Sequence, residues 1–299
     1  MDTYKVKGHL AMLGANTMWG LMSPVAKIVF ASGLIAPIVM VDFRVAGAAL
    51  LFWVTSLFLP REHVPLKDIL RLFGAGMLGI LFNQGCFIIG VNLTSPGEAS
   101  LVTTTMPMWV MLLAWLFLRE PISLKKAGGI ILGAIGAIIL ITGGTAKASG
   151  TNPALGDVVV MCAQLSYALY LTLYRNFIKK YSLVTLMKWM FLSATVVAIP
   201  GSYKWLAATD WGAISPSVWS GVAYVVVCAT FFAYICIMIG QKRLRPTVVG
   251  MYNYVQPIVA TIVGVVLGLD HFTLLKMLAI ILIFSGVWLV TISPSRTPA

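Results

Sequence analysis

Arg44 is the side chain whose type and position most suggest chemistry, because it interrupts a long apolar segment, VDFRVAGAALLF. A guanidinium presents a planar fork of donors that matches the two oxygens of a carboxylate. An unpaired charge at mid-depth in a lipid bilayer costs at least ~2.5 kcal/mol, so Arg44 needs a partner or a wet cavity. Two interpretations remain open: an anchor for a ligand carboxylate, and a structural ion pair or a tie between helices.

Asp42 lies two positions before Arg44, about 200° further round a helix, so the two side chains face different ways. Its position near the outer end of the segment predicts a hydrated carboxylate. Direct contact with the ammonium group of a ligand is the alternative.

Further polar and aromatic residues lie inside apolar segments. Asn16 and Trp19 are three residues apart, as are Gln164 and Tyr167, so each pair shares a helix face. An amide beside an aromatic ring would hold the backbone and apolar part of an amino acid, or an amine through cation–π attraction. Packing alone is the alternative for any single member. We predict a ligand-binding cavity lined by Asn16, Trp19, Arg44, Asn83, Gln84, Thr103, Gln164, Tyr167, Tyr234, Tyr252, Asn253 and Gln256.

Pro107 and Pro257 occupy matching places in two apolar segments. Each removes a helix hydrogen bond and frees the carbonyl four residues earlier, which belongs to Thr103 or Asn253. Such a carbonyl is tolerated at membrane depth only where protein or water satisfies it. We therefore predict a cavity wall and a hinge at these prolines, with passive kinking as the alternative.

Catalysis and metal binding are not indicated. The three histidines lie far apart at segment ends or in loops, and the four cysteines fall within apolar segments without CxxC or metal-ligand spacing. The chain also has no phosphate-binding Walker loop. We therefore expect no enzyme activity, no cofactor, no metal site and no direct use of ATP.

The elements that position these residues are membrane-spanning helices. Of the 299 residues 60% are hydrophobic and 10% are charged, whereas a soluble domain carries roughly 25% charged residues. The apolar runs do not alternate as barrel strands do. The Pro, Gly and polar clusters between the runs predict ten helices, near 8–30, 35–58, 70–91, 96–118, 125–142, 157–178, 183–206, 217–239, 247–268 and 274–292.

The net charge of +12 is a topology signal rather than a nucleic-acid site. Most of the 21 basic residues fall on one side of the predicted spans when the N-terminus is placed inside. The positive-inside rule therefore predicts that both termini are cytoplasmic. We expect a retained first span, a bacterial inner-membrane location, contact with lipid, no nucleic-acid partner, and a monomer or homodimer.

An internal repeat of five spans divides the chain. Residues 66–142 align without a gap on residues 216–292 at an offset of 150, and the first span aligns on the sixth at an offset of 148. Identical residues recur at Phe82 and Phe232, Cys86 and Cys236, Gly90 and Gly240, Pro107 and Pro257, and Gly136 and Gly286. An odd number of spans inverts the second copy, an arrangement typical of alternating-access transporters. We predict repeats over 1–145 and 155–299, joined by a linker over 146–154.

The stretch from Gly97 to Leu140, with its LLAWLFLRE helix end and Gly-rich following helix, resembles the EamA family of the drug/metabolite transporter superfamily. The second half repeats the pattern from Gln256 through Asp270, where the family usually has Glu. The resemblance covers essentially the whole chain. It implies an all-α membrane protein of ten helices in two inverted repeats around a central cavity.

The expected function is secondary transport of small metabolites, with amino acids or related zwitterions as the cargo that Arg44 and the aromatic residues favour. Organic cations or quaternary amines are the alternative, since Trp19, Tyr167 and Tyr234 would form an aromatic cage. A channel or scramblase is a further alternative that the sequence does not exclude.

Overall fold

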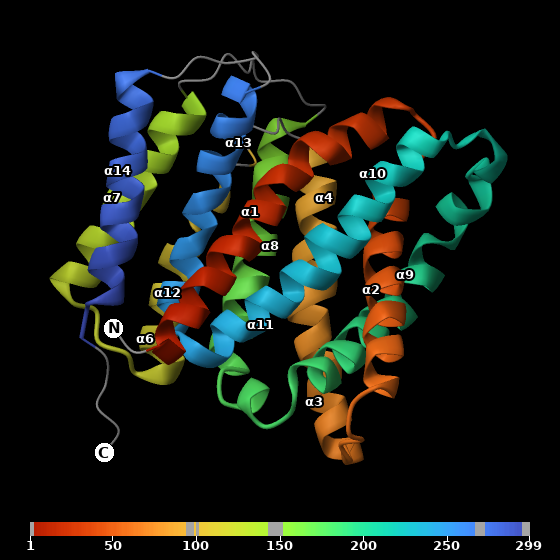
Figure 1. Cartoon of the computed structure of the whole chain (residues 1–299), viewed down its shortest axis with the longest axis horizontal. Coiled ribbons are helices and arrows are strands. Elements are labelled where there is room, and N and C mark those ends of the chain that lie inside the picture. The colour runs from red at the N-terminus through yellow and green to blue at the C-terminus, as the bar shows by residue number, and fades with distance from the viewer. Residues whose placement is uncertain (1–2, 94–98, 100–101, 143–151, 267–272, 295–299) are drawn as a thin grey trace.

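The computed structural model describes residues 3–93, 99, 102–142, 152–266 and 273–294, and its regular structure over these residues is entirely helical (Figure 1). The first part of the chain forms α1 (Thr3–Ala31), α2 (Pro37–Leu57), α3 (Leu66–Gly76), the π-helical η1 (Met77–Phe82), α4 (Asn83–Leu93), α6 (Met106–Leu118) and α7 (Leu124–Thr142). The all-helical fold class expected from the apolar runs is confirmed.

The second part of the chain is also helical. It forms α8 (Pro153–Leu173), η2 (Phe177–Lys179), α9 (Leu183–Ala208), η3 (Trp211–Ala213), α10 (Pro216–Val226), the π-helical η4 (Val227–Phe232), α11 (Ala233–Arg243), α12 (Pro246–Met251), η5 (Tyr252–Tyr254), α13 (Val255–Val266) and α14 (Leu274–Thr291). Most of the predicted linker over 146–154 lies outside the described residues.

Six helical segments within the described residues are long and apolar enough to cross a bilayer. They are Pro37–Leu57, Leu66–Val91, Ala154–Leu173, Leu183–Ala208, Pro216–Arg243 and Leu274–Thr291. A helix is the natural spanning element because it satisfies its own backbone hydrogen bonds in lipid. The chain is therefore a multi-pass membrane protein, and the count of ten spans stays a prediction.

Local sequence signals explain where several helices begin. Pro37, Pro153 and Pro216 lie in the first turns of α2, α8 and α10, where the missing N–H has no helical partner to lose. Ser182 caps α9, since its hydroxyl accepts the backbone N–H of Thr185 at 3.2 Å. These signals set the edges of the helices that carry the polar side chains.

Close helix contacts follow the internal repeat. Gly90 on α4 packs against Val160 and the Gly156 carbonyl of α8, while its counterpart Gly240 on α11 packs against Met12 and the Gly8 carbonyl of α1. In the same way α7 and α14 meet at two glycine contacts, of Gly129 with the Gly286 carbonyl and of Gly136 with the Ala279 carbonyl. Small residues let two helix backbones approach where apolar surface alone gives no preference in lipid.

The beginning of α1 and the end of α14 lie at the same end of the molecule (Figure 1). The Tyr4 hydroxyl donates to the Lys242 carbonyl at the end of α11 at 3.3 Å. Three residues later, Arg245 donates to the Val290 and Thr291 carbonyls at the end of α14, both at 3.0 Å. The start of the first half of the chain and the end of the second half therefore lie at the same end of the molecule.

Candidate functional site

A pocket that is partly open to solvent lies among helices from both parts of the chain. Its lining is Trp19, Met22, Arg44, Asn83, Gln84, Phe87, Thr103, Gln164, Tyr167, Tyr234, Asn253 and Gln256. The structure thus brings together the whole predicted set except Asn16 and Tyr252. Met22 and Phe87 were not predicted.

Arg44 is held in the pocket wall by an uncharged partner. Its side chain is 3% exposed, and its Nε donates to the Thr230 hydroxyl at 3.1 Å. Thr230 in turn donates to the Val225 carbonyl at 2.7 Å, so the hydroxyl is oriented to accept from Arg44. No carboxylate within the described residues forms an ion pair with Arg44, which leaves the terminal guanidinium nitrogens available to an anionic ligand group.

Two π-helical segments position the polar residues of the pocket. Asn83 and Gln84 follow η1 directly, Tyr234 comes two residues after η4, and Thr230 lies within η4. Gln84 Nε2 donates to the Tyr234 hydroxyl at 2.7 Å, which joins the two segments across the pocket. A π-helical turn rotates the residues after it relative to a regular helix and is frequent at functional sites.

The α1 and α13 side of the pocket is built from amides. Gln256 Nε2 donates to Asn16 Oδ1 at 3.0 Å and lies 3.3 Å from Asn253 Oδ1. Asn16 donates to the Met12 carbonyl at 2.8 Å, and it stands behind Gln256 rather than in the lining. Asn16 therefore orients a pocket residue from outside the pocket.

Aromatic residues form the remaining wall. The indole N–H of Trp19 donates to the Ala229 carbonyl at 2.9 Å, and its ring meets the Tyr234 ring edge-on at 5.9 Å. The Tyr167 hydroxyl accepts from Gln241 at 3.1 Å, next to a hydrogen bond from Tyr170 to Gln241 at 3.0 Å. These bonds fix the rings as rigid surfaces against which an apolar group would pack.

Tyr252 lies away from the pocket. Its hydroxyl is 2.7 Å from His9 Nδ1, where α1 meets η5. Tyr252 is therefore not among the lining residues, and its part in ligand binding stays a prediction.

The helices around the two prolines are interrupted. Residues 104–105 form a turn before α6, in which Pro107 lies in the first turn, and η5 interrupts the helix just before Pro257. The Tyr254 hydroxyl lies 3.1 Å from the Thr104 carbonyl and 3.2 Å from the Ile130 carbonyl. The interruptions fall where the prolines predict them, and the hinge role stays a prediction.

Asp42 is not hydrated as expected. It is 4% exposed, it does not line the pocket, and neither carboxyl oxygen has a hydrogen-bond partner among the described residues. The lining residues that the structure describes contain one cation, Arg44, and no acidic side chain. The pocket is thus electropositive, with amide groups as its main polar surface.

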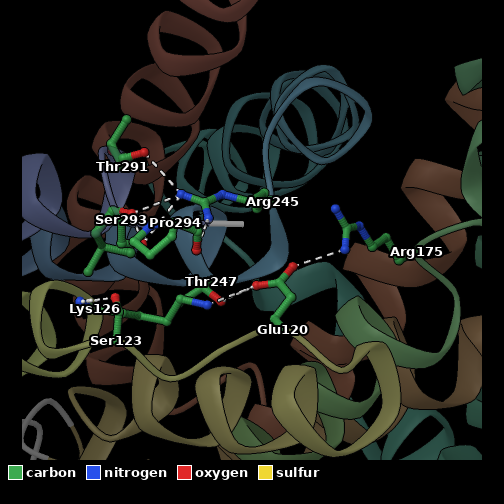
Figure 2. A network of polar contacts seen from close by, with 10 residues as sticks. Glu120, Ser123, Lys126, Arg175, Arg245, Thr247, Thr291, Ser293 and Pro294 are labelled. Carbon is green, nitrogen blue, oxygen red and sulfur yellow. Dashed lines mark hydrogen bonds and ion pairs between the residues drawn. The ribbon is translucent and has the colours of Figure 1, made fainter. Parts of the chain in front are cut away.

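A polar network, shown in Figure 2, ties the two parts of the chain together, and it lies at the end of the molecule where α1 begins (Figure 1). Glu120 lies just after Arg119, which ends α6 in the left-handed backbone region at φ 53°. Its carboxylate binds Lys126 at 3.1 Å and Arg175 at 2.9 Å, and accepts from Thr247 at 3.3 Å. Glu120 is 3% exposed, so these partners compensate its charge at a buried site.

Two further carboxylates make the same kind of connection. Asp68 binds Lys180 and accepts from the Tyr181 hydroxyl at 2.5 Å. The Asp68 hydrogen bond raises the pKa of Lys180. Glu62 accepts the backbone N–H of Ser182 at 3.0 Å. All three acids therefore connect the first part of the chain to the second at this end.

An all-helical membrane protein with a polar pocket shared between its two sequence halves has the construction of a transporter. The family comparison agrees, since residues 6–142 and 154–292 match the EamA-like transporter family model. The chain belongs to this family, as its sequence resemblance indicated.

Individual relatives are named as transporters. The chain is 23% identical to the uncharacterized transporter YetK of Bacillus subtilis, covering 97% of this chain and 86% of that protein. It is 26% identical to the uncharacterized inner membrane transporter YedA of Escherichia coli, covering 97% and 92%. A crystal structure of a protein with 17% identity matches with a TM-score of 0.76 over 97% of both chains, which shows a shared fold.

Proposed function

We propose that the chain is a secondary transporter that moves amino acids or related zwitterions across the bacterial inner membrane by alternating access. The observation that carries this proposal is Arg44, a buried guanidinium in a pocket without acidic lining residues among those described. Its fork matches a substrate carboxylate. Amide oxygens of the lining would accept hydrogen bonds from the substrate ammonium, and the aromatic wall would pack against its apolar part.

The proposed architecture is ten spans in two inverted repeats, over 1–145 and 155–299, joined by the linker at 146–154. Contacts that recur between equivalent residues support it: Gly90 with α8 matches Gly240 with α1, and η1 matches η4 at the offset of 150. A pseudo-two-fold axis would produce such reciprocal pairs.

Alternating access would use the interruptions at Pro107 and Pro257. A helix with a broken hydrogen-bond ladder bends at lower cost than a regular helix. Because the pocket draws residues from both repeats, a rocking motion of one repeat against the other would expose the pocket to each side in turn.

Counterflow in proteoliposomes tests the proposal. Vesicles loaded with an unlabelled amino-acid panel should accumulate the matching radiolabelled amino acid transiently, and the exchange should saturate. Saturable exchange would also separate a carrier from a channel or scramblase. No counterflow across a broad panel would contradict the amino-acid assignment.

Organic cations are the second candidate, because Trp19, Tyr167 and Tyr234 present aromatic faces and edges to one pocket. A quaternary amine would gain cation–π attraction there. It would also meet Arg44 without a compensating carboxylate among the described lining residues, which disfavours a purely cationic cargo. Radiolabelled choline in the same vesicles distinguishes the two candidates.

A further inference from the structure

The Asp42 carboxyl is a buried ionisable group that the proposed substrate site does not use. It is 4% exposed, and both oxygens lack a hydrogen-bond partner among the described residues. An ionised carboxylate without donors is strongly disfavoured in a protein interior, and such a group takes up a proton instead. The burial and the missing donors together favour a neutral carboxylic acid.

The neighbour of Asp42 on α9 is a serine, which can accept a hydrogen bond from a protonated carboxyl. Ser202 is the side chain that lies against Asp42, and its hydroxyl proton is directed to its own helix, 3.0 Å from the Ala198 carbonyl. A serine hydroxyl has a single proton to donate, so Ser202 has only lone pairs left for Asp42. With its proton placed on the Ala198 carbonyl, Ser202 accepts from a carboxylic acid, whereas a hydroxyl turned toward Asp42 would donate to the carboxylate.

No charge in the surrounding elements stabilises an ionised Asp42. The described elements α4, α10 and η4, which pack against α2, contain no Asp, Glu, Lys or Arg. On α9, Lys188 lies over the Trp53 ring near the opposite end of α2, and Lys204 is exposed without an ion pair to Asp42.

The other titratable groups on these elements are also occupied or uncharged. Tyr203 on α9 is exposed. The Tyr224 hydroxyl of α10 donates to the Met18 carbonyl at 3.2 Å, and Cys86 of α4 and Cys228 of η4 are free thiols. On α2 itself, Arg44 is directed to Thr230.

We propose that Asp42 is a proton-binding site that couples proton movement to transport. It rests on the proposed alternating access, because α2 and α9 are equivalent helices of the two repeats and their interface buries Asp42. Rocking would admit water to this interface, and the carboxyl would then release its proton to water and leave a hydrated carboxylate. Closing the interface would require a proton to be taken up from water. Only the O–H bond of Asp42 forms and breaks.

Infrared spectroscopy of the purified full-length protein in lipid tests the site with the proton itself as the probe. The wild type should show the carbonyl band of a protonated carboxylic acid at neutral pH, and Asp42→Asn should lose it. Asp210→Asn, which changes an exposed aspartate in the same way, should keep it. Asp42→Glu should shift the band, which covers the case in which the asparagine variant does not fold. An unchanged band in Asp42→Asn and Asp42→Glu would overturn the proposal.

A second measurement separates coupling from the cargo assignment. An imposed pH gradient should drive accumulation of the amino acid that shows counterflow, and Asp42→Asn should lose this accumulation while it keeps counterflow. If the wild type shows counterflow but the pH gradient drives no accumulation, the proposal that proton movement is coupled to transport is overturned. If the wild type shows no counterflow, the cargo assignment fails, and the infrared band still decides whether Asp42 binds a proton.

Discussion

At the scale of single residues, substitutions of Arg44 distinguish an anchor for a ligand carboxylate from a structural tie between helices. Arg44→Gln removes the charge and should weaken binding of a carboxylate-bearing ligand by about tenfold to a hundredfold, since charge-assisted hydrogen bonds contribute roughly 1.5–3 kcal/mol. Arg44→Lys keeps the charge without the planar fork of donors, and its affinity for the ligand should lie between those of the wild type and Arg44→Gln. The measurement is the ligand-dependent rise in melting temperature of the purified protein.

Arg71→Gln, which changes a partly exposed guanidinium on α3, is the matched control and should keep the wild-type ligand response. If Arg44→Gln also binds with full affinity, then Arg44 serves only as the tie to Thr230, and the cargo assignment loses its main support.

Much of the pocket was predictable from single residues, because a polar side chain in an apolar helix needs a partner or water. Met22 and Phe87 were not predicted, because residue type alone does not distinguish an apolar lining residue from the other residues of an apolar helix. Spacing held the missing signal: Met22 lies three residues after Trp19, and Phe87 three after Gln84, on the same helix faces. Asp42 was misjudged because burial between α2 and α9 depends on tertiary packing.

At the scale of helices, the contact between α7 and α14 depends on glycine at chosen positions. A Cβ on Gly129 would lie 2.7 Å from the Gly286 carbonyl, whereas a Cβ on Gly128 would meet nothing within 4 Å. Gly129→Ala should therefore lower the melting temperature, because displacing the backbone should reduce the free energy of unfolding by roughly 1–3 kcal/mol. Gly128→Ala should leave it unchanged or raise it slightly through helix propensity. Equal melting temperatures for the two variants would contradict the close contact.

Helix positions were more predictable than helix interruptions. The segment predicted at 35–58 became α2 over Pro37–Leu57, because apolar length and a first-turn proline are both local signals. Prolines marked the breaks before α6 and α13. The π-helical turns η1 and η4 have no such local signal, and Thr230 within η4 bonds to Arg44, which is distant in sequence.

At the scale of the whole molecule, the adjacent ends of α1 and α14 predict one location for both termini. The excess of basic residues on that side predicts the cytoplasm. Reporter fusions should therefore give the cytoplasmic signal at either terminus: fluorescence from a protein that folds only inside, and no activity from a phosphatase that needs export. Opposite locations for the two ends would contradict an even number of spans.

The three acidic residues that join the two halves also predict which end would be closed under the proposed alternating access. Glu62, Asp68 and Glu120 each connect the first half to the second at the end where the termini lie. Removing two of them, in Asp68→Asn combined with Glu120→Gln, should shift the population toward a form open at this end. Each ~1.4 kcal/mol of lost closure energy changes the ratio of the two forms tenfold.

A cysteine at Tyr174 in an otherwise cysteine-free protein reports this opening, because Tyr174 is half-buried near the same end. An impermeant maleimide added to inside-out vesicles should label it several-fold faster in the double variant than in the parent. Asp210→Asn, at the far end of α9, removes an acid without removing a tie and should label at the parent rate. Equal rates in all three proteins would mean that these ties stabilise the fold without selecting between its two open forms, because a contact that persists in both forms cannot shift their ratio.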